Sequence, residues 1–263
     1  MFTSPASHGL RFAFGTLTVL PVRVTRWDRE AARGGMLTAP VVGLTVGCGA
    51  ALVAVLLLVL GASPALAAVG AVATPAVLTR GLHLDGLADT ADGLGSGKPA
   101  EDALRIMKQS DIGPFGVLAL VFVVAGQIAA LAQVYDVSRA RGAFVTVTAA
   151  VVARTALTLA TRAGVPAARP DGLGAAVAGV VPVRWAAGVA LVVVGAAAAV
   201  AGVSFGAYEI LPAVLAVLAA LAVAELLLRH CTRRFGGVTG DVFGGVAEST
   251  ATAALVAMSL SLG

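Results

Sequence analysis

The sequence predicts an all-α polytopic integral membrane protein, a helical bundle of about seven transmembrane helices with short interfacial helices. Composition is the first reason: the 263 residues are 59% hydrophobic and 12% charged, with a mean hydropathy of +0.96. Soluble domains carry roughly 25% charged residues. The second reason is that several apolar stretches are long enough to span a membrane, and the third is that basic residues fall on one side of them. We treat residues 1–263 as a single membrane domain.

The apolar stretches give the predicted elements in chain order. Residues 8–20 are apolar but short, which predicts an interfacial or re-entrant helix. Two short helices are predicted outside the spans, over residues 84–94 and within residues 96–110. Each span has close to the ~20 residues that a tilted helix needs to cross ~30 Å of hydrocarbon. The predicted spans are residues 36–60, 64–80, 114–134, 143–162, 184–203, 207–228 and 244–261.

The basic residues are biased to one side of these spans. With the N-terminus in the cytoplasm, fifteen lysines and arginines are cytoplasmic, Arg139 and Arg141 lie opposite, and Arg154 lies within a span. This bias follows the positive-inside rule. Because the basic residues report orientation in the membrane, the net charge of +4 does not indicate a nucleic acid. We expect a lipid bilayer and no nucleic acid as partner.

An aspartate-rich segment, residues 81–113, lies on the predicted cytoplasmic face. Asp85, Asp89 and Asp92 are spaced i, i+4 and i+7, which places them on one stripe of a helix. Like charges so close repel one another, and a divalent cation removes the conflict. Carboxylate ligands favour Mg²⁺ or Mn²⁺, which commonly bind phosphate oxygens as well. We therefore expect these three residues to be catalytic and metal-binding; the alternative is a solvated acidic loop.

A second polar segment, "RRFGGVTGDVFGGVAES", spans residues 233–249. Asp241 and Glu248 are spaced i, i+7 on one helix face, although Asp241 could instead be a helix N-cap. Glu248 falls inside a span, where an ionisable residue indicates function. Arg154 must also find a partner within the membrane, and the candidates are Glu225, Glu248 or a substrate phosphate.

Several basic residues are candidates for phosphate contacts. The alternative for each is that its charge orients the chain in the membrane, forms a structural ion pair or contacts lipid headgroups. The candidates for substrate binding are Lys108, Arg154, Arg162, Arg169 and Arg234, together with Asp241 and Glu248. The residues thus predict a membrane site that faces the cytoplasm and holds an aspartate-bound divalent metal and a phosphate-bearing substrate.

Four motifs in order resemble the cobalamin-5′-phosphate synthase family, also called adenosylcobinamide-GDP ribazoletransferases. They are "LRFAFGTLTVLPV", "GLHLDGLADTADGL" followed by "IMKQSDIGPFG", "ARTALTLATRAGVPAARPDGLG" and "GGVTGDVFGGVAE". Two positions differ from the pattern expected of the family, at Gly35-Met36 and at Ala251.

The resemblance implies an enzyme of cobalamin biosynthesis in the cytoplasmic membrane of a prokaryote. Its substrates would be adenosylcobinamide-GDP and α-ribazole or α-ribazole 5′-phosphate, and GMP would leave. It implies Mg²⁺ as the metal, which we expect Asp85, Asp89 and Asp92 to hold. One of these aspartates could serve as general base, and our choice is Asp92. Arg154, Arg162 and Arg234 would contact phosphate or GMP, and Asp241 and Glu248 would hold a second metal or orient a substrate.

Two other functions compete with this interpretation. A phosphotransferase of the CDP-alcohol type shares the chemistry, but here Asp89 stands where that family's pattern has Ala-Arg. A transporter would use intramembrane Arg154 and Glu248 as an ion path, yet the sequence shows no clear internal repeat. Small residues in many spans also allow a homo-oligomer.

Overall fold

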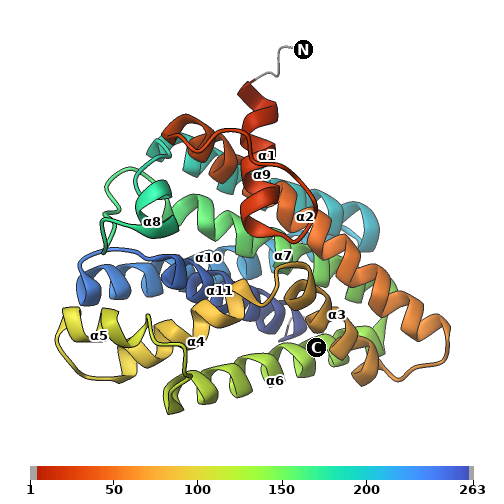
Figure 1. Ribbon diagram of the computed structural model, residues 1–263. Helices are drawn as coiled ribbons and strands as arrows, with labels where there is room; N and C mark the ends of the chain where they lie inside the picture. Colours follow the sequence, from red (N-terminus) through yellow and green to blue (C-terminus); the bar gives the residue numbers. More distant parts are fainter. Residues whose placement is uncertain (1–4, 261–263) are drawn as a thin grey trace.

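The computed structural model describes residues 5–260, which form a bundle of α-helices (Figure 1). No extended strand occurs in this range; its only β-type pairing is two isolated bridges. The helices are α1 (Pro5–Leu17), α2 (Arg29–Val59), α3 (Pro64–Leu78), α4 (Leu82–Gly95), α5 (Ala100–Ile106), α6 (Pro114–Val137), α7 (Arg139–Ala160), α8 (Gly172–Val177), α9 (Val183–Phe205), α10 (Ile210–Phe235) and α11 (Gly240–Leu260), with a 3₁₀ turn, η1 (Ala207–Glu209), before α10.

The predicted spans are helices in the structure. Six segments of the described chain are long and apolar enough to cross a membrane: α2, α6, α7, α9, α11, and η1 with α10. Helix α3 meets this test only together with α4, and the pair bends by 89° at the break between them. Helix α4 therefore does not continue the path of α3. The short helices predicted over residues 8–20, 84–94 and 96–110 correspond to α1, α4 and α5.

Helix α7 is the most buried of the candidate spans and packs along α2. Two glycines of α2 permit this close approach. A β-carbon at residue 43 would lie 2.5 Å from the carbonyl oxygen of Ala150, and one at residue 47 would lie 2.9 Å from the Cα atom of Val147. Small residues at such contacts let helix backbones pack closely where no hydrophobic effect drives association.

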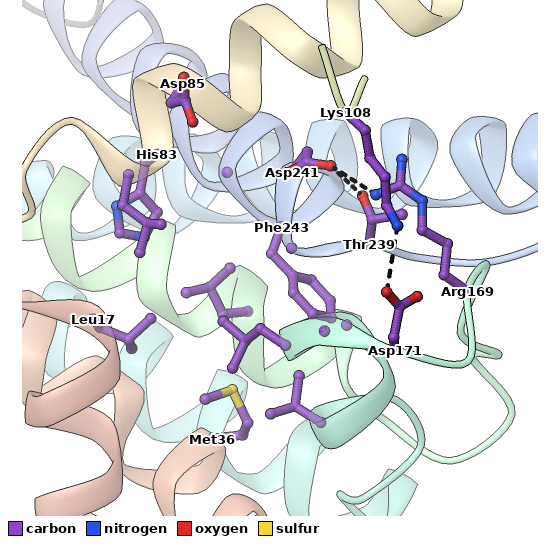
Figure 2. Close-up of a pocket in the computed structure, with 18 residues that line it drawn as sticks. Leu17, Met36, His83, Asp85, Lys108, Arg169, Asp171, Thr239, Asp241 and Phe243 are labelled. Atoms are coloured by element: carbon purple, nitrogen blue, oxygen red, sulfur yellow. Dashed lines mark hydrogen bonds and ion pairs between the residues drawn. The ribbon is translucent and has the colours of Figure 1, made fainter. Parts of the chain in front are cut away.

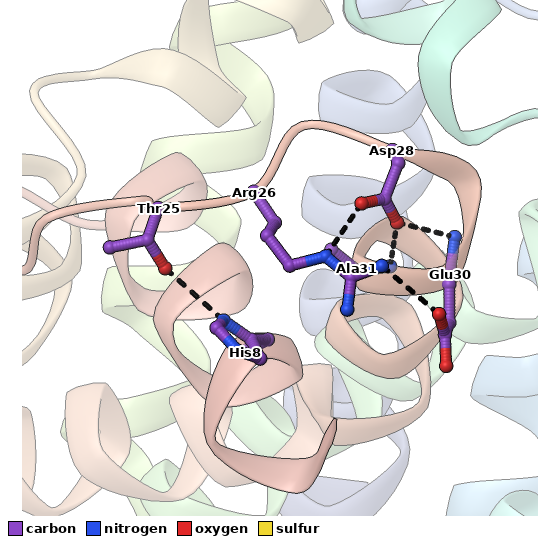
Figure 3. A network of polar contacts seen from close by, with 6 residues as sticks. All are labelled: His8, Thr25, Arg26, Asp28, Glu30 and Ala31. Carbon is purple, nitrogen blue, oxygen red and sulfur yellow. Dashed lines mark hydrogen bonds and ion pairs between the residues drawn. The ribbon is translucent and has the colours of Figure 1, made fainter. Parts of the chain in front are cut away.

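A polar network fixes the start of α2 (Figure 3). Asp28 is the N-cap and accepts hydrogen bonds from the backbone amides of Glu30 and Ala31 at 3.1 and 3.0 Å. The Arg26 guanidinium donates to both Asp28 and Glu30 at 2.7 and 3.0 Å. The Ala31 amide and then the Arg26 guanidinium lower the pKa of the Asp28 carboxyl. This network sets the direction in which α2 leaves the segment after α1.

Candidate functional site

The site is built where α4 crosses α11. The crossing needs glycine on both helices. A β-carbon at residue 86 would lie 2.6 Å from the carbonyl oxygen of Asp241, and one at residue 244 would lie 2.8 Å from the carbonyl oxygen of His83. Backbone contact at this point brings Asp241 of α11 next to the aspartates of α4. These two acidic segments lie about 150 residues apart in the chain and meet only through this crossing.

The aspartates of α4 follow one helical stripe, but their surroundings change along it. Asp85 is exposed, Asp89 is half-buried, and Asp92 is buried with 6% of its surface exposed. The stripe thus runs from the open end of the site into the protein. The three carboxylates cannot all meet a substrate in the same way.

Asp92 is held by the start of α6. Its two carboxylate oxygens accept hydrogen bonds from the backbone amides of Gly113 at 2.8 Å and Gly116 at 2.9 Å. A carboxylate at a helix N-terminus satisfies otherwise unpaired amides and opposes the positive end of the helix dipole. A β-carbon at residue 116 would lie 2.5 Å from one carboxylate oxygen. This placement favours a structural role for Asp92 over the expected role of general base.

Asp89 lies among like charges. Burial, and then the charges of Asp241, Asp85 and Asp92, raise the pKa of the Asp89 carboxyl to about 7, while Arg169 acts in the opposite sense. A bound cation would relieve this repulsion. Among the described residues, no group of three or more His, Cys, Asp or Glu side chains is arranged to hold a metal ion by itself.

Asp241 is not the N-cap of α11, which was the alternative role considered for it. It lies in the first turn, and the hydroxyl of the preceding Thr239 accepts a hydrogen bond from the Val242 amide at 3.2 Å. The same hydroxyl donates to the Asp241 carboxylate at 3.2 Å, and Arg169 approaches that carboxylate at 3.7 Å. Thr239 caps the helix, so the carboxylate of Asp241 is left to face the site (Figure 2).

Two cavities flank α4, and Asp85 lines both. The first, which we call the α8 cavity, has a volume of about 290 Å³ and lies between α4, α8 and α11. The second, which we call the loop cavity, has a volume of about 730 Å³ and is bounded by residues 79–82, residues 109–112 and the end of α1. Asp89 lines the loop cavity, and Asp241 lines the α8 cavity.

The structure separates the basic residues that were expected to bind phosphate. Lys108 and Arg169 line the α8 cavity, where Lys108 contacts Asp171 at 3.3 Å (Figure 2). Arg162 instead pairs with Glu225 at 2.8 Å. Arg234 donates to the carbonyl oxygen of Lys98, and its guanidinium lies 5.7 Å from the ring centroid of Phe235. Neither Arg162 nor Arg234 lines either cavity.

Arg154 lies apart from both cavities, deep in the bundle with 3% of its surface exposed. Glu225, one of the three partners considered for Arg154, contacts Arg162 and Arg229 instead. Arg154 and Glu248 line a small cavity of about 50 Å³, and Glu248 accepts a hydrogen bond from Gln127 at 3.0 Å. The Nε and Nη2 atoms of Arg154 have no hydrogen-bond partner among the described residues. Glu248 lines neither the α8 cavity nor the loop cavity.

Sequence reasoning missed three residues of these cavities. Gln127, which holds Glu248, lies in an apolar span and gave no signal beyond being polar there. Thr239 lines the α8 cavity and caps α11. Arg80 lines the loop cavity with a left-handed backbone, φ 51°, next to Gly81, φ 70°. The Arg80-Gly81 pair makes the turn from α3 into α4, and the glycine before "LHLD" was the available signal.

These features together define a class of protein. It is an integral membrane helical bundle whose carboxylates and basic side chains gather around two cavities at one end of its spans. Carboxylates grouped beside lysine and arginine suit a metal-assisted reaction on phosphate groups.

Comparison with known proteins names the family within that class. The family model described as Cobalamin-5-phosphate synthase matches residues 9–259, and the chain belongs to this family. It is 45% identical to the adenosylcobinamide-GDP ribazoletransferase of Frankia casuarinae, over 96% of this chain and 94% of that protein. It is 40% identical to the enzyme of the same name from a Nocardioides species, over 94% and 96% of the two chains. No solved structure matches the chain.

Proposed function

We propose that the protein is an adenosylcobinamide-GDP ribazoletransferase of cobalamin biosynthesis. It joins adenosylcobinamide-GDP to α-ribazole or α-ribazole 5′-phosphate and releases GMP. The observation that carries this function is membership of the cobalamin-5-phosphate synthase family over residues 9–259, supported by relatives of that name at up to 45% identity. The gathering of Asp85, Asp89 and Asp241 between two cavities supports it independently, because a reaction of two substrates needs both to reach one centre.

The metal that suits this site is Mg²⁺. Mg²⁺ is commonly bound by one or two carboxylates together with substrate phosphates and water. That requirement agrees with a site in which burial and then the neighbouring carboxylates raise the pKa of Asp89, yet no described group of three ligands is already assembled. Asp89 and Asp241 would hold the ion. When bound, it neutralises the charge that develops on the phosphates as GMP leaves.

The protein's own residues would bind and orient the substrates. In the reaction, a ribose hydroxyl oxygen bonds to the phosphorus nearer the cobinamide arm, and the bond from that phosphorus to GMP breaks. Asp85 is exposed and lines both cavities, so it is placed to accept the hydroxyl proton. Lys108 and Arg169 lie where they can meet phosphate oxygens.

We also propose that the protein lies in the inner membrane of a prokaryotic cell and that its site faces the cytoplasm. Fifteen of the basic residues lie in segments assigned to that side, and Arg139 and Arg141 lie in the segment assigned to the other. Assembly into a homo-oligomer stays a prediction. Labelling of single cysteines placed at residues 98 and 139, in intact cells with an impermeant reagent, tests the orientation. We expect the reagent to modify residue 139 and not residue 98. Modification of residue 98 and not of residue 139 would mean that the site faces the opposite side of the membrane.

GMP release tests the function. Purified protein in liposomes is given adenosylcobinamide-GDP, α-ribazole 5′-phosphate and Mg²⁺, and each component is then omitted in turn. We expect release only with both substrates, and none after addition of EDTA. Release with a lipid alcohol in place of ribazole would support the CDP-alcohol type of transferase. Flux of a substrate across the liposome without GMP release would support a transporter.

A further inference from the structure

The two cavities that share Asp85 differ in size and lining. The loop cavity is the larger, about 730 Å³, and its wall includes Arg80, Ser110 and Asp111. The α8 cavity, about 290 Å³, is close to the lower end of typical ligand pockets, roughly 300–1,000 Å³. The difference indicates that the cavities receive different molecules.

The α8 cavity has an apolar part and a charged part. Figure 2 shows Lys108, Arg169 and Asp171 close together at one side, with Leu17 and Met36 away from them and Phe243 between. The apolar part is completed by Leu157, Leu173 and Val177. Its volume and lining suit an uncharged ring that carries a single anionic group at one end.

The two cations of this cavity are available to an anion. Lys108 is more than half exposed, and its contact with Asp171 is a long one of 3.3 Å between exposed side chains, so it contributes little to stability. Arg169 donates to the carbonyl oxygen of Leu104 and reaches Asp241 only at 3.7 Å. A phosphate dianion competes well for both groups because it accepts short, charge-assisted hydrogen bonds.

We infer that the α8 cavity is the ribazole subsite, with the benzimidazole ring among Met36, Leu157 and Phe243 and the 5′-phosphate at Lys108 and Arg169. The inference rests on the proposed function. Of the two substrates, only the ribazole combines an uncharged aromatic ring with one phosphate, and a corrinoid is too large for this volume. The pyrophosphate of adenosylcobinamide-GDP then enters from the loop cavity, and the two substrates meet at Asp85, which lines both.

Two forms of one substrate test the charged part of the subsite. In Lys108→Met we expect the KM for α-ribazole 5′-phosphate to rise about 10- to 100-fold, as expected for loss of a hydrogen bond between charged groups. The KM for unphosphorylated α-ribazole and for adenosylcobinamide-GDP should stay unchanged. Arg105→Met is the matched control, because Arg105 is a highly exposed cation of α5 that lines neither cavity. Its three KM values should equal those of the unaltered protein.

A second variant tests the apolar part. Leu173→Trp fills the cavity from α8, and Leu173 is only partly buried, so the fold should tolerate the change. We expect the KM for both forms of ribazole to rise and that for adenosylcobinamide-GDP to stay the same. A rise in the KM for adenosylcobinamide-GDP alone, in either variant, would overturn the inference. So would unchanged KM values in both folded variants.

Binding without turnover separates this inference from the proposed function. Equilibrium dialysis of the unaltered protein against α-ribazole 5′-phosphate, without the second substrate, should show binding that Lys108→Met weakens and Arg105→Met does not. Such binding in a protein that releases no GMP would sink the proposed function and leave the subsite intact. If the unaltered protein releases GMP but neither Lys108→Met nor Leu173→Trp alters the binding or the KM of ribazole, the subsite is wrong and the proposed function stands.

Discussion

The two ends of the helical bundle use charge in opposite ways. At the end formed by η1 and the start of α7, Arg141 and Glu209 form an ion pair of 2.6 Å, with side chains only 20% and 14% exposed. The Arg141 guanidinium also lies 5.0 Å from the ring centroid of Phe205. At the α4 end, Asp85, Asp89 and Asp241 lie near one another. Within the described chain, the only basic side chain within 4.0 Å of any of these three carboxylates is Arg169, which approaches Asp241.

This difference separates structural charges from functional ones. The Arg141–Glu209 pair is neutral as a unit and connects α7 to the segment before α10, so its role is complete within the fold. Asp85, Asp89 and Asp241, in contrast, repel one another, and the buried charge of Asp89 destabilises the fold that holds it. Crowded ionisable groups of this kind mark functional sites more often than structural ones.

The largest stability change is expected at Asp92, the one α4 aspartate whose charge is used by the fold. Asp92→Ala removes two hydrogen bonds to the start of α6. We expect it to lower the free energy of unfolding by about 3–6 kcal/mol, since each of the two charge-assisted bonds contributes about 1.5–3 kcal/mol. Thermal unfolding in detergent measures this. Asp92→Asn, which keeps one acceptor, should be intermediate, whereas a fully stable but inactive Asp92→Ala would make Asp92 a catalytic residue.

A smaller loss is expected at the opposite end of the bundle. Glu209→Gln leaves Arg141 without its counter-ion, and we expect a loss of about 1–2 kcal/mol, between the values for exposed and fully buried pairs. GMP release should stay within about twofold of the unaltered protein, because a change this far from the site has no contact through which to act. A large loss of turnover in folded Glu209→Gln would mean that both ends serve the reaction.

The effect expected at Asp89 has the opposite sign. Its folded pKa of about 7 exceeds the ordinary 3.8, so the folded, metal-free protein holds the proton more tightly than the unfolded chain. This group therefore makes the protein less stable as the pH rises from about 4 to 7. Asp89→Asn should be more stable than the unaltered protein at pH 8 without metal, and the difference should shrink towards pH 4. Equal melting temperatures of Asp89→Asn and the unaltered protein at pH 8 would contradict the raised pKa of Asp89.

Much of the fold could be predicted because the bilayer fixes the length of an apolar helix. Six spans predicted from hydropathy correspond to α2, α6, α7, α9, α10 and α11, whereas the span predicted over residues 64–80 corresponds to α3, which is long enough only together with the bent α4. The i, i+4, i+7 spacing placed the aspartates on one stripe of α4. These features are local, because each depends on residues within a few turns of one another.

The rest depends on contacts between distant segments, which a single sequence does not show. The burial of Asp92 requires the amides of Gly113 and Gly116. Glu225 of α10 pairs with Arg162, just beyond the end of α7, in place of Arg154 within α7. Lys108 and Arg169 reach a cavity and Arg162 and Arg234 do not, yet all four looked alike as basic residues near the ends of spans.

The most direct test of this account is a single-turnover measurement of GMP release by Asp89→Asn beside Glu209→Gln. Both remove one carboxylate charge, and both are read against the unaltered protein with saturating substrates and Mg²⁺. We predict that Asp89→Asn slows release by about 10²–10⁴-fold, since a metal ion supplies several kcal/mol of transition-state stabilisation, while Glu209→Gln keeps its rate. Release by folded Asp89→Asn at the unaltered rate would contradict the claim that these crowded carboxylates are kept for the reaction.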